Sequence, residues 1–180
     1  MLDFERPLLV GVIFDLSIAH GPDGRRNIDV IKDALIQRVL DNKVMSKIYV
    51  AAPSWMAIPR DQGESTYYII SYKEPEKFSI DMLFKQAVTV VGECLEDTDK
   101  HIFLFTDRFH SPHNYQYRKG FLTNEIRDYG IKISVFGIGD SSDNPTLKSM
   151  TEEYNGNFVD LKDVSLSSEK ISGVLAANGN

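Results

Sequence analysis

The chain has 180 residues and a formal net charge of −6. This length suffices for one well-cored domain but is short for two, so we expect a single domain spanning residues 1–180. The 20 lysines and arginines are scattered rather than clustered, and a net negative field repels a phosphate backbone, so nucleic acid is not an expected partner.

Cysteine usage and hydropathy indicate a cytoplasmic protein with no membrane partner. The one cysteine, Cys94, falls within an apolar helical pattern, so there is no disulfide framework and a reducing compartment suits the chain. No apolar run approaches the roughly 18 residues that a membrane span requires. Asp3, Glu5 and Arg6 stand where a signal peptide would have its apolar core.

The first predicted strand, residues 8–14, is an uninterrupted apolar run. Such a run is typical of a central parallel strand that is covered on both faces. After a loop, Asn27 is predicted to cap a helix, because apolar residues then recur at intervals of three and four: Ile28, Ile31, Leu35 and Val39.

Two further strands are predicted at residues 47–51 and 66–72, the second rich in aromatic and β-branched residues. The segment between them contains Pro53, Pro59 and Gly63 and has no helical pattern. We therefore expect an antiparallel pair of strands joined by a long loop, with residues 66–72 at the edge of the sheet.

Helices and strands alternate through the rest of the chain. Strands are predicted at 101–106, 131–138 and 158–161. The intervening helices are marked by a cap at Ser79, a stop at Gly130, a start at Pro145 and a last apolar stripe around Ile171, Val174 and Leu175. The pattern predicts an α/β fold with a doubly wound, mostly parallel six-stranded sheet, one antiparallel edge strand and helices on both faces.

Two acidic residues stand where predicted strands end. Asp15 closes the first strand and Asp107 follows the strand at 101–106. In an open α/β sheet the ligand crevice lies beyond the carboxyl ends of the strands, where the strand order reverses. The sequence therefore predicts that these two carboxylates face each other across a crevice.

Three segments carry a resemblance to a known family. They are Asp15-Leu16-Ser17-Ile18-Ala19, Thr106-Asp107 and Val135-Phe136-Gly137-Ile138-Gly139-Asp140. From about Leu8 to Leu175 the chain resembles the von Willebrand factor A (VWA) domain, a Rossmann-like fold. The resemblance implies a metal-ion-dependent adhesion site, built from a first-loop Asp-x-Ser-x-Ser pattern, a threonine from a middle loop and an aspartate after the fourth strand.

Mapped onto this sequence, the resemblance assigns Asp15, Ser17 and Asp107 as metal ligands, with Thr106 beside them. Ser79 is the hydroxyl nearest to the place of the middle-loop threonine. Ala19 stands where the pattern has its second serine, so one oxygen ligand is missing. The alternative is a vestigial site that binds no metal.

The resemblance implies a function without catalysis. Mg²⁺ or Mn²⁺ suits oxygen ligands, and an Asp or Glu side chain of a protein partner would complete the octahedral shell. Domains of this family recruit other proteins, and intracellular ones often work beside further subunits. We therefore expect a protein–protein interaction module that belongs to a larger assembly rather than an enzyme.

Three alternatives remain open. Gly11-Val12-Ile13-Phe14-Asp15 also resembles the first motif of haloacid dehalogenase-like phosphatases, with Asp15 as nucleophile, although Ser17 stands where those enzymes have a second carboxylate. A zinc site would form if His20, His110 and His113 converge near Asp15 and Asp107. A purely structural alternative is that the two aspartates cap helices and accept hydrogen bonds from loop amides.

Overall fold

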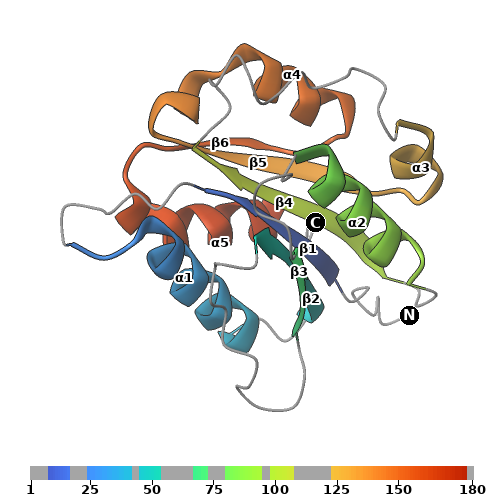
Figure 1. The fold of residues 1–180 in the computed structure, drawn as a ribbon, viewed down its shortest axis with the longest axis horizontal. Helices are drawn as coiled ribbons and strands as arrows, with labels where there is room; N and C mark the ends of the chain where they lie inside the picture. The colour runs from blue at the N-terminus through green and yellow to red at the C-terminus, as the bar shows by residue number, and fades with distance from the viewer. Residues whose placement is uncertain are drawn as a thin grey trace.

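The computed structural model describes residues 8–16, 24–41, 45–53, 67–72, 80–94, 98–107 and 123–177. These residues form an α/β fold in which helices flank a parallel sheet (Figure 1). The strands are β1 (Leu8–Asp15), β2 (Met45–Pro53), β3 (Tyr67–Tyr72), β4 (Asp99–Thr106), β5 (Lys132–Ile138) and β6 (Phe158–Leu161). They are ordered β3-β2-β1-β4-β5-β6 across the sheet.

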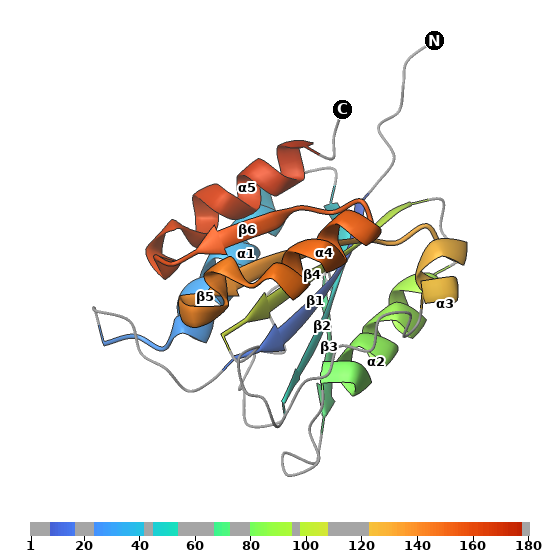
Figure 2. The same cartoon turned by 90° about the horizontal axis from the view of Figure 1, so that it is seen from above.

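The helices cover the sheet on both faces. They are α1 (Asn27–Asp41), α2 (Ile80–Gly92), α3 (Thr123–Asp128), α4 (Pro145–Glu153) and α5 (Ser167–Ala177), with 3₁₀ turns η2 (Gly139–Asp143) and η3 (Val164–Leu166). Figure 2 shows α1 and α5 on one face, with α2 and α3 on the other. None of the described helices has the length and apolar character needed to cross a membrane.

The direction of β3 corrects the sequence prediction. We expected the edge strand to be antiparallel, but β3 pairs with β2 in parallel, from Ile48 opposite Tyr67 to Pro53 opposite Tyr72. A parallel pair needs a crossover of about a dozen residues or more, whereas an antiparallel pair needs only a short turn. The connecting residues 54–66, which lie outside the described part, are numerous enough for that crossover.

Two apolar cores lie on opposite faces of the sheet because strand side chains alternate in direction. On one face, Val10, Val12 and Phe14 of β1 pack with α1 and α5. On the other face, Leu9 and Ile13 pack with the helices α2, α3 and α4. The central strands are therefore buried on both sides, as their apolar sequences predicted.

Candidate functional site

The candidate site is built on the carboxyl ends of β1 and β4. The two strands are parallel neighbours, and their register places Asp15 opposite Thr106. The Thr106 hydroxyl donates a hydrogen bond to Asp15 Oδ2 at 2.9 Å. The Asp107 backbone N–H donates to the Asp15 carbonyl oxygen at 3.3 Å. The two acidic residues that the sequence placed at separate strand ends are thus adjacent in space.

The position of this pair within the sheet matters for ligand binding. From β1 the chain crosses to β2 and β3 on one side, and β4 leads to β5 and β6 on the other side. The strand order therefore reverses between β1 and β4. Crevices that hold ligands in open α/β sheets form at this point, beyond the carboxyl ends of the strands.

Burial gives the Asp15 carboxylate its chemical character. Asp15 and Thr106 are both 0% exposed, whereas Asp107 is half-buried. A buried carboxylate is costly unless hydrogen bonds or a cation compensate its charge, and the Thr106 hydroxyl provides one such bond. Carboxylate and hydroxyl oxygens are hard ligands, so these residues fit Mg²⁺ or Mn²⁺ better than a soft metal.

Helix α2 begins at the same edge and on the same face as Asp15. Alternation along β1 turns Asp15 to the side of Leu9 and Ile13, which is the side that α2 covers. Because α2 connects the parallel strands β3 and β4, it runs back along the sheet, and its first residue, Ile80, lies at the carboxyl edge. A helix N-terminus favours negative charge, so it suits acidic groups at this crevice.

The turn η2 contains two buried serines that the sequence analysis did not assign to a site. Ser141 and Ser142 are buried in η2, which follows β5 at the same edge of the sheet. A Cβ on Gly137 would lie 2.3 Å from the Ser141 carbonyl oxygen, so only glycine allows η2 to fold so closely against β5. Gly137 pairs with Thr106, which pairs with Asp15, so this turn lies two strands away from Asp15. The Gly-x-Gly-Asp-Ser-Ser sequence was a signal for this turn.

Several predicted site residues fall outside the part of the chain that the structure describes. They are Ser17, Ser79, His20, His110 and His113. Within the described part, no cluster of three or more His, Cys, Asp or Glu residues could hold a metal. A cation at this edge would therefore need hydroxyl, water or partner oxygens, besides the carboxylates, to complete its shell.

The fourth histidine, His101, lies at the opposite end of β4 and takes no part in this site. It is 1% exposed, its Nε2 lies 2.8 Å from Ser134 Oγ, and its ring contacts Phe103 edge-on. Ser134 Oγ also accepts a hydrogen bond from the Asn157 N–H at 2.9 Å. Burial, with a smaller contribution from the charge of Lys132, lowers the pKa of His101 to about 3. His101 is therefore a neutral core residue at physiological pH.

Comparison with known proteins adds no family to this geometry. No family model matches the sequence, and no curated protein matches it either. The functional assignment therefore depends on the residues at the carboxyl edge of the sheet.

Proposed function

We propose that this protein is a non-catalytic interaction module of the VWA type, which binds an acidic group of a protein partner through a divalent cation at the crevice beside Asp15 and Asp107. The observation that carries the proposal is the hydrogen bond from Thr106 to the buried Asp15, with Asp107 bonded to the same residue through its backbone. Asp15, Thr106 and Asp107 thus lie together where the strand order reverses.

Each residue has a distinct part in this proposal. Thr106 orients the Asp15 carboxylate, so that one of its oxygens is already engaged before a ligand arrives. Asp107 is the more exposed of the two acids and would meet the cation from the solvent side. Ser17 and Ser79 remain the proposed additional oxygen ligands, and the partner's Asp or Glu would occupy a remaining position of the shell.

The residue two positions after Asp15 argues against phosphoryl transfer. Phosphatases of the haloacid dehalogenase type use a second carboxylate there as general acid and base, whereas this chain has Ser17. We therefore favour an interaction module, which would work as one subunit of a larger cytoplasmic assembly.

The proposal predicts a Mn²⁺ site that depends on Asp107. Isothermal titration of Mn²⁺ into the wild-type protein should show one site, and Asp107→Asn should weaken it by roughly tenfold or more, because an amide keeps the shape of the side chain but removes the charge. Asp128→Asn is the matched control. It removes the same charge from an exposed position in α3 and should leave the affinity unchanged.

Two results would contradict the proposal. The first is the same Mn²⁺ affinity in wild type and Asp107→Asn, or no Mn²⁺ binding at all. The second is magnesium-dependent release of phosphate from an aryl phosphate that Asp15→Asn abolishes, which would indicate a phosphatase.

A further inference from the structure

Among the described residues, the sheet ends at β6. β6 is the last strand in the sheet order, and no described segment pairs with it beyond β5. The Val135 N–H donates to the Asn157 carbonyl oxygen at 2.9 Å. In a parallel ladder, alternate residues turn both backbone groups to the same neighbour, so Phe158 and Asp160 turn their N–H and C=O groups outward. These groups can pair with an incoming strand.

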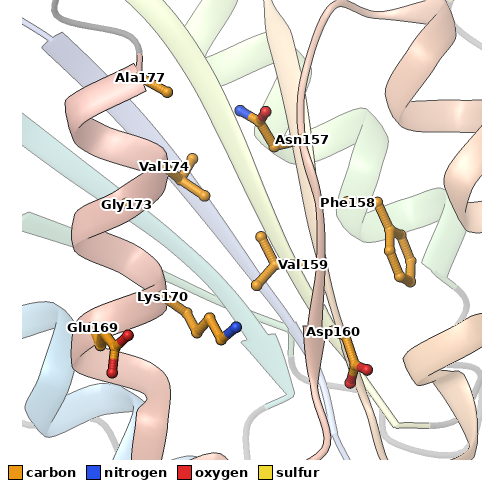
Figure 3. A pocket seen from close by; sticks show the side chains of 9 residues that line it. All are labelled: Asn157, Phe158, Val159, Asp160, Glu169, Lys170, Gly173, Val174 and Ala177. Atoms are coloured by element: carbon orange, nitrogen blue, oxygen red, sulfur yellow. The ribbon is translucent and has the colours of Figure 1, made fainter.

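A pocket adjoins this edge on the face covered by α5. It has a volume of about 400 Å³ and lies between β6 and α5. Val159 of β6 and Val174, Gly173 and Ala177 of α5 provide its apolar lining (Figure 3). Val159 is only partly buried, so apolar surface remains available beside these outward-facing backbone groups.

Charge is confined to one end of the pocket. Figure 3 shows Lys170 extending from α5 toward β6, below the level of Val174. Asp160 already has a partner in Lys162, with Nζ and Oδ2 3.6 Å apart. Among the described residues, neither Lys170 nor its neighbour Glu169 forms an ion pair. Within that part of the chain, Lys170 is therefore a free positive charge at the end of an apolar pocket.

The spacing of these features matches an extended peptide. Lys170 and Val174 are one helical turn apart, which is about 6 Å along α5. Side chains on one face of a β-strand repeat every second residue, at about 6.6 Å. A strand along β6 can thus place an aliphatic side chain against Val174 and an acidic side chain, two residues away, against Lys170.

We propose that β6 and the pocket beneath α5 form a docking site for an extended peptide of a partner protein, which adds as a strand to β6. Its backbone pairs with Phe158 and Asp160, an aliphatic side chain enters the pocket, and an acidic side chain two positions away meets Lys170. Main-chain pairing supplies affinity in this recognition mode, while the pocket supplies specificity. The site is separate from the crevice at Asp15.

The test begins with a displayed library of random peptides, from which peptides that bind the wild-type protein are selected. We expect enrichment of peptides with an aliphatic residue and an acidic residue two positions apart. The most enriched peptide is then measured by fluorescence anisotropy against Asp160→Pro and Asp160→Ala. Proline removes the outward N–H and is tolerated at a strand edge, so it should weaken binding by roughly tenfold or more. Alanine keeps the N–H and should leave binding near that of the wild type.

A second pair of variants tests the pocket without touching the strand. No atom lies within 4 Å of a Cβ added to Gly173, so Gly173→Leu fits the fold and fills the pocket, while Gly173→Ala leaves most of it open. Gly173→Leu should weaken peptide binding by roughly tenfold, and Gly173→Ala should weaken it only slightly. Asp107→Asn should bind the peptide normally, which separates this site from the crevice. The proposal is overturned if no such pattern is enriched, or if binding survives both Asp160→Pro and Gly173→Leu.

Discussion

At the scale of single residues, the chain contains two buried polar arrangements with different consequences. Asp15 and Thr106 lie at the carboxyl edge of the sheet, where a buried carboxylate can contact a ligand. His101 and Ser134 lie at the other end of the strands, within the core that α5 covers. The first pair belongs to the proposed binding crevice, whereas the second bears on the pH dependence of stability.

The burial of the neutral His101 ring predicts a loss of stability in mild acid. Its pKa is about 3 in the folded protein, against 6.5 for an ordinary solvent-exposed histidine, because burial disfavours the charged ring. Below pH 6.5 the unfolded chain therefore binds a proton that the folded chain does not, and the free energy of unfolding falls as pH decreases. The slope from this residue averages roughly 1 kcal/mol per pH unit between pH 5 and pH 7. Urea denaturation between about pH 5 and pH 7 measures it.

His101→Gln is the variant that isolates this effect, because glutamine does not titrate and can still bond to Ser134. It should remove most of the slope. Three described carboxylates have lowered pKa values: Asp29, Asp143 and Asp163. Their contribution to stability is lost only below the ordinary aspartate pKa of 3.8, which lies outside this pH window. Equal slopes in the variant and the wild type would show that His101 does not titrate as the structure requires.

At the scale of elements, sequence signals were sufficient where a residue type has a specific backbone role. Gly130 ends α3 with φ of 65°, and Pro145 starts α4 as predicted. The predicted direction of β3 was wrong because strand direction depends on the path of the connecting segment, which composition does not encode. The contact between Asp15 and Thr106 needs the register of β1 and β4, and packing of both strands sets that register.

The cap of α4 gives a prediction at this scale. Asn144 Oδ1 accepts hydrogen bonds from the N–H groups of Thr146 at 2.9 Å and Leu147 at 3.2 Å. Asn144→Ala should lower the free energy of unfolding by about 1 kcal/mol, because two helix donors lose their acceptor. Asn144→Asp keeps the acceptor and should retain most of the stability in urea denaturation. An equal loss in both variants would mean that the cap is not the source of the effect.

At the scale of the whole molecule, the fold presents two separated surfaces. The carboxyl edge at β1 and β4 carries Asp15 and Asp107. At β6, the last strand of the described sheet, outward-facing backbone groups lie beside an apolar pocket. Sequence periodicity predicted the α/β class, because central parallel strands must be apolar on both faces. It did not predict the pocket, which arises where α5 and the short edge strand β6 lie apart.

The central claim is that Asp15 and Asp107 hold a cation between them, and anomalous diffraction from crystals soaked in Mn²⁺ tests it most directly. We predict an anomalous peak within coordination distance of both carboxylates, on the solvent side of Thr106. A structure with both carboxylates well ordered and no peak beside them at saturating Mn²⁺ would contradict the account.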